Sequence, residues 1–113
     1  MHEFSVTKSL IELCEQEAEK NGLENVHQIH LKLGKFTGFS SESIKFYFHY
    51  LSSKTRCHNA EIVCEEIPIK IQCHNCDKLS TIDEPIMLCP GCGSQNIEIV
   101  SGREFYVESI VGE

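Results

Sequence analysis

Two cysteine pairs constrain the fold of this chain more than any other feature of its sequence. They are Cys73-His-Asn-Cys76 and Cys89-Pro-Gly-Cys92, and twelve residues separate them. Each Cys-x-x-Cys turn brings two sulfurs to one side, and the intervening chain is long enough to go out and come back. Four thiolates can then form the tetrahedron that zinc prefers in closed structural sites. The spacing therefore predicts a Zn(Cys)4 site, with a pair of reducible disulfides as the alternative.

The segment that carries these cysteines is expected to be a zinc-ribbon module over residues 70–101. A module of about thirty residues buries too little apolar surface to hold itself together. Zinc binding contributes about 10–16 kcal/mol in finger-like peptides and can replace the missing core. We therefore expect a closed site whose role is structural, without an open coordination position for chemistry.

The first half of the chain has the periodicity of two helices and one strand. Residues 4–20 are expected to form an amphipathic helix that ends at Asn21-Gly22, where either residue tolerates a left-handed cap. Ile29, Leu31 and Leu33 alternate with polar residues, which predicts a half-buried strand. Ser40 or Ser41 can cap a second helix. The expected buried stripe of the first helix is Val6, Leu10, Leu13, Cys14 and Ala18, and that of the second is Ile44, Tyr47, Phe48 and Leu51.

Two further stretches have the pattern of strands. The apolar phase of residues 60–71 shifts near Glu65-Glu66, which predicts a bulge or a handover between two sheets. The last stretch, residues 103–111, alternates around Phe105, Val107 and Ser109. We expect this last strand to return and pair with the strand near residues 60–69.

These elements predict an α+β fold. We expect a small mixed three-stranded sheet covered by two helices, because two strands alone make a marginal sheet. The zinc-ribbon module is then an insertion in this domain. The expected domains are residues 1–69 with 102–113, and residues 70–101.

Composition limits the classes of function. The chain has 113 residues, 41% of them hydrophobic and 24% charged, which is typical of a soluble globular protein. No apolar run is long enough to span a bilayer, and the start lacks the pattern of a secretory signal. Seven cysteines without such a signal favour a reducing compartment, so we expect a cytoplasmic protein with no membrane partner.

The charge of the chain argues against nucleic-acid binding. The formal net charge is −7, and both parts of the chain are acidic: residues 1–68 carry seven Lys/Arg and ten Asp/Glu, and residues 69–113 carry three and seven. Zinc ribbons that bind nucleic acid need a basic surface. A zinc-ribbon module associated with nucleic acid or transcription is therefore the alternative function and not the preferred one.

The start of the chain offers a second metal site. The terminal amine, the deprotonated amide nitrogen of His2 and its ring Nδ1 can form fused chelate rings around one ion. The amide nitrogen of Glu3 can complete a square plane, or its carboxylate can act as an axial or outer donor. Nitrogen donors in that geometry suit Ni(II) or Cu(II), whereas zinc prefers a tetrahedron. From the residues alone, a solvated histidine near a terminus is the other account.

Taken together, these features resemble the HypA family (HypA/HybF), the nickel-incorporation proteins of hydrogenase maturation. The resemblance rests on Met1-His2-Glu3-Phe4-Ser5-Val6 at the start of a helix, on Gly34 at the end of the first strand, and on the four cysteines. It covers the full length. It implies a nickel metallochaperone whose nickel site is formed by His2 with Met1 and Glu3, and whose structural zinc is held by Cys73, Cys76, Cys89 and Cys92.

The same resemblance implies partners and has two departures. It implies delivery of nickel to the [NiFe]-hydrogenase large subunit with a HypB-type GTPase, and in some bacteria to urease with its accessory proteins. Some relatives carry a histidine directly after each cysteine pair, where this chain has Asp77 and Gly93, so a pH switch by exchange of His for Cys is not expected. The loop after Gly34 has no carboxylate before Glu42 to add an oxygen donor.

The remaining reactive side chains are expected to be structural or solvated. Cys14 and Cys64 fall on apolar faces and are expected in the core, and Cys57-His58 is expected in an exposed loop. Glu15, Glu17 and Glu19 are expected on a solvated helix face, and His27, His30 and His49 at the surface or its boundary. We find no catalytic motif and expect no enzyme; a dithiol redox enzyme is excluded if the thiols hold zinc.

Overall fold

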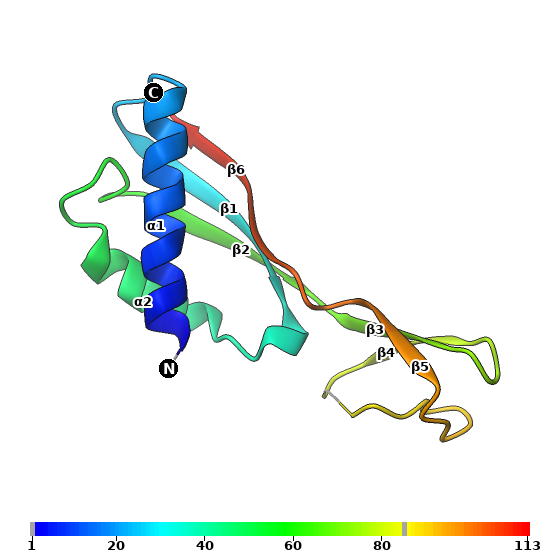
Figure 1. The fold of residues 1–113 in the computed structure, drawn as a ribbon. Coiled ribbons are helices and arrows are strands. Elements are labelled where there is room, and N and C mark those ends of the chain that lie inside the picture. The colour runs from blue at the N-terminus through cyan, green and yellow to red at the C-terminus, as the bar shows by residue number, and fades with distance from the viewer. Residues whose placement is uncertain (1, 85) are drawn as a thin grey trace. The chain divides into compact units, whose positions relative to one another are not determined.

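Two helices and two small sheets form the part of the chain that the structure describes. The computed structural model describes residues 2–84 and 86–113, and only the backbone of His2. The strands form two three-stranded sheets, in the orders β2-β1-β6 and β4-β3-β5 (Figure 1). The predicted α+β class is confirmed. In chain order the elements are α1 (His2–Lys20), β1 (Val26–Gly34), the 3-10 turn η1 (Lys35–Thr37), α2 (Ser41–Leu51), β2 (Glu61–Ile67), β3 (Ile69–Cys73), β4 (Leu79–Ile82), β5 (Ile97–Ser101) and β6 (Phe105–Gly112).

The chain divides into two compact units. The first unit contains the residues up to Lys32, together with Phe39–Glu65 and Tyr106–Glu113. The second unit contains Leu33–Gly38 and Glu66–Phe105, which includes the whole of the expected cysteine module. That the two units are independently folding domains, with the boundaries expected from the sequence, stays a prediction.

The core of the first unit lies between two helices and a sheet. Both helices lie on the same face of the sheet β2-β1-β6 (Figure 1). Each fully buried aliphatic or aromatic side chain contributes about 1.5–3 kcal/mol relative to an exposed one. The buried apolar side chains of this unit are Leu10, Ile11, Cys14, Ala18, Val26, Ile29, Leu31, Ile44, Phe48, Cys57 and Ile62.

The buried stripe of α1 differs from the expected one at Leu13. This side chain is 45% exposed, while Thr7 and Ile11 are buried in the stripe. Thr7 is tolerated there because its hydroxyl donates a 2.5 Å hydrogen bond to the carbonyl oxygen of Glu3. Leu13 belongs to the edge of the stripe, so it remains apolar at the surface of the helix.

The helix ends follow the expected capping residues. Gly22 has a φ of 70° after α1, which confirms the predicted left-handed stop. The hydroxyl of Ser40 accepts a 3.3 Å hydrogen bond from the backbone N–H of Ser43, so Ser40 is the N-cap of α2.

The loop after α2 is more buried than the sequence predicted. Glu15 accepts hydrogen bonds from the backbone N–H of Arg56 at 3.0 Å and from its Nη1 at 2.9 Å, so it is not a solvated residue of the helix face. Cys57 is fully buried, and its expected place in an exposed loop is wrong. Burial raises the pKa of Cys14 to about 12, with smaller contributions from Cys57 and Glu17, which keeps this thiol protonated and unreactive.

The strands differ from the expected pairing in one respect. The shift near Glu65-Glu66 is a handover between sheets, because β2 and β3 belong to different sheets with Pro68 between them. The last strand, β6, pairs with β1 and not with β2. The most buried strand occupies the centre, and that strand is β1. Ser109 is exposed, since the alternation of β6 changes phase after Val107.

Gly34 is expected to be the least replaceable glycine of the second unit. A Cβ at this position would lie 2.1 Å from the carbonyl oxygen of Gly102 and 2.6 Å from the backbone nitrogen of Glu104. Both obstacles are backbone atoms, so Gly34→Ala should lower the free energy of unfolding by about 3 kcal/mol in urea denaturation. Gly38→Ala is the control: its Cβ meets nothing within 4 Å, and only the strain of its φ of 73° should cost about 1 kcal/mol. Equal losses in the two variants would contradict the steric explanation.

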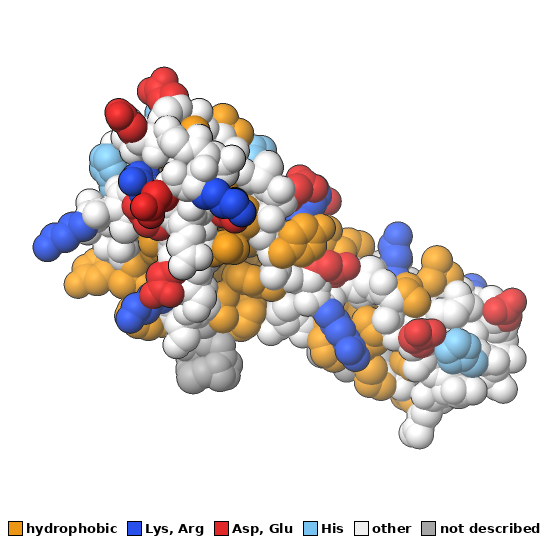
Figure 2. Space-filling view, turned by 45° about the horizontal axis from the view of Figure 1, so that its top comes forward, with side chains coloured by type: hydrophobic (Ala, Val, Ile, Leu, Met, Phe, Trp, Pro, Cys, Tyr) orange, Lys and Arg blue, Asp and Glu red, His pale blue; other side chains and the backbone are white. Residues whose placement is uncertain are grey.

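The described part of the chain has no membrane-spanning helix, and its face in Figure 2 has no basic patch. No helix in the described part of the chain is long and apolar enough to cross a membrane. Acidic and basic side chains are interspersed on the face shown in Figure 2, and the described side chains there form no continuous basic area. This distribution agrees with the net charge of −7 and does not favour nucleic-acid binding.

Candidate metal centre

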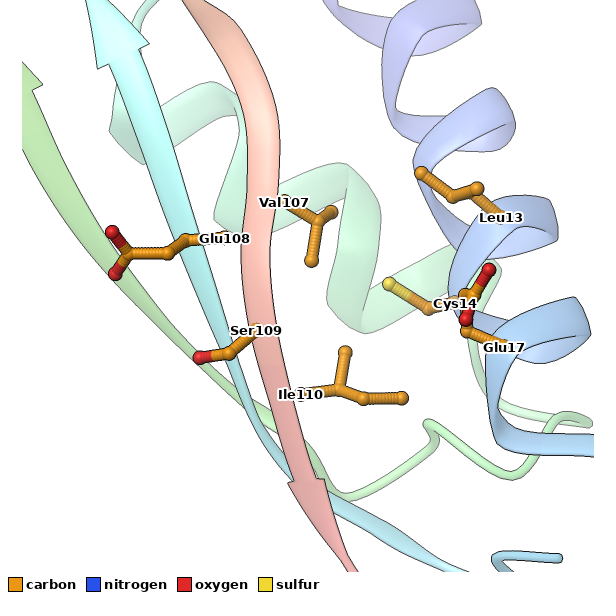
Figure 3. Close-up of a pocket in the computed structure, with 7 residues that line it drawn as sticks. All are labelled: Leu13, Cys14, Glu17, Val107, Glu108, Ser109 and Ile110. Carbon is orange, nitrogen blue, oxygen red and sulfur yellow. The ribbon is translucent and has the colours of Figure 1, made fainter. Parts of the chain in front are cut away.

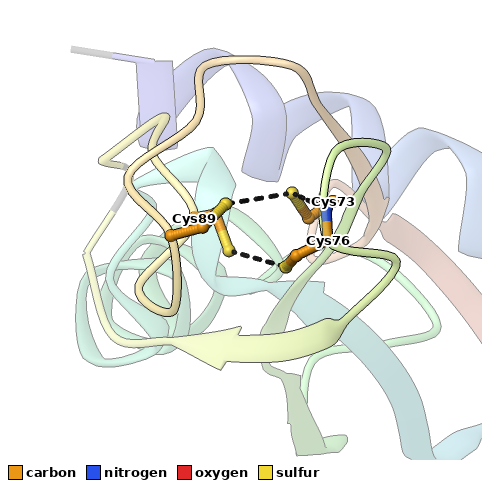
Figure 4. A group of neighbouring side chains, drawn as sticks. Cys73, Cys76 and Cys89 are labelled. Atoms are coloured by element: carbon orange, nitrogen blue, oxygen red, sulfur yellow. Dashed lines mark hydrogen bonds between the residues drawn. The ribbon is translucent and has the colours of Figure 1, made fainter.

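The four cysteines of the two pairs meet in the second unit, and Figure 4 labels three of them, Cys73, Cys76 and Cys89. Cys73 is the last residue of β3, Cys76 follows in the turn before β4, and Cys89 and Cys92 lie in the loop before β5. The four Sγ atoms all lie within 4.8 Å of one another, and among the described residues this is the group whose geometry could hold a metal ion. The predicted convergence of the two pairs is therefore confirmed.

The distances between the sulfurs fit a tetrahedral zinc ion. The Sγ atoms of Cys73 and Cys92 are 3.7 Å apart, and those of Cys76 and Cys89 are also 3.7 Å apart. A zinc ion with Zn–S bonds of about 2.3 Å requires sulfurs about 3.8 Å apart at the corners of a regular tetrahedron. A disulfide requires about 2.05 Å, and all four thiols are free. The donor set therefore fits zinc, and the disulfide alternative is not supported.

Both cysteine turns are built in the same way. The backbone N–H of Cys73 donates to the carbonyl of Lys78 at 2.9 Å, and that of Cys89 donates to the carbonyl of Ser94 at 2.9 Å. Each turn ends in a left-handed residue directly after its second cysteine: Asp77 has a φ of 60° and Gly93 a φ of 75°. Gly93 tolerates this conformation because it has no Cβ, whereas the left-handed Asp77 was missed from the sequence. The sequence signal for Asp77 is its position directly after the second cysteine of the first pair, which matches that of Gly93 in the second pair.

Backbone N–H groups point at two of the sulfurs. The Sγ of Cys73 accepts from Asn75 at 3.3 Å and from Cys76 at 3.4 Å, and the Sγ of Cys89 accepts from Gly91 at 3.4 Å. Hydrogen bonds from backbone N–H groups favour the thiolate: those from Cys76 and then Asn75 lower the pKa of Cys73, and those from Cys92 and then Gly91 lower the pKa of Cys89 to about 6.

The thiol of Cys76 has the opposite tendency in the metal-free cluster. Its hydrogen bond to Cys73 is the largest cause that raises the pKa of Cys76 to about 12. Four adjacent thiolates repel one another, so the metal-free cluster keeps protons that a bound cation would displace. The metal-free cluster is therefore suited to bind a divalent cation.

The histidine nearest the cluster interacts with a carboxylate. The Nε2 of His74 lies 3.3 Å from the Oε1 of Glu98, and both side chains are at least half exposed. The four sulfurs complete a tetrahedral set without it. That the cluster has no pH switch by exchange of His for Cys stays a prediction.

The residues expected to bind nickel are the first three of the chain. Met1 and the side chain of His2 fall outside the described residues. Glu3 is described: its Oε2 accepts a 3.0 Å hydrogen bond from the backbone N–H of Ser40, the N-cap of α2. The structure thus joins the first turn of α1 to the loop before α2, a link that no sequence pattern indicated.

Comparison with known proteins decides the family. Residues 1–112 match the family described as hydrogenase/urease nickel incorporation, metallochaperone, hypA. The chain belongs to the HypA family. Hydrogenase maturation factor HypA of Caldanaerobacter subterraneus is 38% identical over 111 residues, which cover 97% of each chain. The HypA of Moorella thermoacetica is 32% identical over 113 residues, which cover all of both chains.

Solved HypA structures have the same fold. The solution structure of the nickel metallochaperone HypA from Helicobacter pylori superposes with a TM-score of 0.70 and 24% identity, covering 99% of this chain and 97% of that one. A second HypA solution structure gives a TM-score of 0.73 over 100% and 97% of the two chains, also at 24% identity. As a HypA protein, this chain is a nickel metallochaperone of hydrogenase maturation, a class that is not described as catalytic.

Proposed function

We propose that this HypA protein binds Ni(II) at its N-terminus through His2, with the terminal amine of Met1 and with Glu3, and passes the ion to [NiFe]-hydrogenase during maturation. The observation that carries the proposal is the match to a nickel-incorporation family over residues 1–112, which includes Met1-His2-Glu3. In this proposal nickel is the transported ion, and the four cysteines bind a different ion with a structural role.

The start of α1 supports nickel binding by its backbone. The first N–H groups of a helix have no carbonyl partner within the helix. The backbone amides of His2 and Glu3 lie at this position, because α1 begins at His2. They can therefore lose their protons to a metal without breaking a helical hydrogen bond. Together with the amine and an imidazole nitrogen, they supply the planar nitrogen donors that suit Ni(II).

Glu3 supports the site by holding the first turn in place. Its carboxylate accepts the N–H of Ser40 across 37 residues of sequence. This bond occupies one carboxylate oxygen and anchors the helix start beside the N-cap of α2. We infer that Glu3 positions the nickel ligands and adds negative charge for a cation, and that a site with few protein ligands allows release by ligand exchange.

The resident ion is proposed to be zinc, held by Cys73, Cys76, Cys89 and Cys92. A bound zinc ion would cross-link the two cysteine turns and would have no catalytic role. The four cysteines complete its coordination, so cargo nickel does not need to enter this cluster. The two metals are thus assigned to different units of the chain.

The partner proteins are proposed to include a HypB-type GTPase and the hydrogenase large subunit, with urease as a further acceptor. Exposed aromatic side chains of α1 and α2 support contact with a protein partner. Phe4 is 44% exposed and Phe46 69%, and each packs edge-to-face on Tyr47 at 5.5 Å. Exposed aromatic clusters are typical of protein interfaces.

X-ray absorption on untagged, zinc-loaded protein with one equivalent of Ni(II) tests the assignment. We expect nickel surrounded by nitrogen and oxygen donors and zinc surrounded by four sulfurs, because the two sites offer different ligands. Sulfur in the first shell of nickel would contradict the N-terminal site, and fewer than four sulfurs around zinc would contradict the closed cysteine site.

A further inference from the structure

Strand β6 lies at an edge of the sheet β2-β1-β6 and pairs with a strand on one side only. No other described strand pairs with its outer side. An edge strand presents backbone N–H and C=O groups to which an extended segment of another chain can add. The outer side of β6 is therefore a potential pairing edge, provided that side chains nearby can hold the added segment.

An apolar groove runs along this edge between β6 and α1 (Figure 3). Its volume is about 260 Å³. Val107 and Ile110 point from β6 toward the helix, and Leu13 and Cys14 point from α1 toward the strand (Figure 3). A strand edge beside a helix with an apolar groove between them is the arrangement in which extended peptides bind by strand addition.

The walls of the groove contain apolar surface that the fold leaves uncovered. Leu13 is 45% exposed although it lies on α1 next to the core, and Val107 and Ile110 are only half-buried. Cys14 is fully buried and forms the floor. The groove is thus suited to an aliphatic side chain placed against Leu13, Val107 and Ile110.

The groove also carries one uncompensated charge. Glu17 lines it from α1 and is exposed, and its carboxylate has no ion-pair partner in the part of the chain that the structure describes. Glu108 points to the other side of the sheet, where its Oε2 lies 3.5 Å from the Nζ of Lys32. The charge that an added segment meets is therefore negative, and a lysine or arginine side chain complements it.

We propose that this groove is a docking site for a short extended segment of a partner protein, with an aliphatic side chain between α1 and β6 and a basic side chain at Glu17. The segment pairs by its backbone with the outer edge of β6. It is short, because the phase change at Glu108 and Ser109, both exposed, interrupts regular pairing. A second copy of this chain is a poor occupant, since pairing of two β6 strands would bring the Glu17 side chains of both copies to the same acidic groove.

Titration with synthetic peptides tests this proposal on the full-length, zinc-loaded protein. The probe is acetyl-Thr-Val-Thr-Arg-Thr-Ile-Thr-amide, whose valine, arginine and isoleucine share one face of a strand, compared with the same peptide carrying glutamate in place of the arginine. We expect the basic peptide to shift the backbone amide signals of residues 13–17 and 106–111 in nuclear magnetic resonance spectra and to slow hydrogen exchange along β6. Methylating alternate peptide nitrogens, in the two possible patterns, should abolish binding in one pattern only, because only one row of N–H groups faces β6.

Two matched charge-reversal variants distinguish an effect of the charge in the groove from an effect of the net charge of the protein. Glu17→Lys should weaken the basic peptide at least about fivefold and favour the acidic one, because it reverses the charge in the groove. Glu19→Lys makes the same change in net charge on an exposed position of α1 outside the groove, and it should leave both affinities within about twofold.

Four outcomes would overturn the proposal. Equal effects of Glu17→Lys and Glu19→Lys would show that only net charge matters. Signal shifts confined to other surfaces, or no shifts with the basic peptide at millimolar concentration, would show that the groove takes no such segment. A dimer seen by sedimentation and abolished by Glu17→Lys would assign the edge to a second copy instead.

Discussion

His2→Ala is expected to lower the affinity for Ni(II) by at least about 100-fold while leaving zinc content and fold unchanged. The substitution removes the imidazole that closes the second chelate ring, and the remaining amine and amides are a much weaker set without it. Calorimetric titration of Ni(II) into zinc-loaded, untagged protein measures the loss. Elemental analysis and circular dichroism check that zinc and secondary structure are retained.

Two controls define this result. His27→Ala removes a histidine from the surface of the same unit, where its Nε2 lies 3.3 Å from the Oε1 of Glu113, and it should leave the nickel affinity unchanged. Acetylation of the terminal amine keeps His2 but blocks one nitrogen donor, so it should weaken nickel binding as His2→Ala does. Unchanged affinity in either His2→Ala or the acetylated protein would sink the N-terminal assignment.

The convergence of the four cysteines was predictable because the information for it is local. Two Cys-x-x-Cys turns fix the positions of their own sulfurs, and a short connection leaves few ways to place them apart. The four Sγ atoms lie within 4.8 Å of one another as the spacing required. Asp77 was not predicted, because a left-handed φ of 60° in a residue other than glycine follows from the geometry of the turn and not from the preference of the residue.

The fold class was predictable from periodicity, whereas contacts between distant segments were not. The buried stripe of α1 was correct at Leu10, Cys14 and Ala18 and wrong at Leu13, because a stripe has edges that only the neighbouring strand defines. The pairing of β6 with β1 was missed, since alternation tells which face of a strand is buried and not which strand lies beside it.

Long-range polar contacts were equally invisible in the sequence. Glu15 holds the loop at Arg56, and Glu3 holds the loop at Ser40, each across about forty residues of sequence. A glutamate on a helix is ordinarily solvated, and nothing in its neighbours marks it as a partner of a distant backbone N–H. Each of these two carboxylates gains a structural role only through a tertiary contact, and such contacts are what the sequence did not predict.

Cys73→Ala is expected to remove zinc and to unfold most of the second unit, while the first unit stays folded. Few side chains of the second unit are buried: Leu33, Ile69, Ile71, Cys73 and Cys89 are its buried apolar residues, and two of these five are proposed zinc ligands. The loss of about 10–16 kcal/mol of metal binding exceeds the stability of an ordinary small domain. Backbone amide signals of residues 66–105 should therefore collapse to the narrow range of an unfolded chain.

The matched control for this substitution is Cys64→Ala, which removes a thiol from β2 outside the metal cluster. It should keep one zinc ion per chain and the full dispersion of the second unit. A chelator added to the unmodified protein should reproduce the spectrum of Cys73→Ala, because both treatments remove the same cross-link. A second unit that keeps its dispersion without metal would mean that its apolar contacts suffice, and the zinc ion would then need a role other than holding the fold.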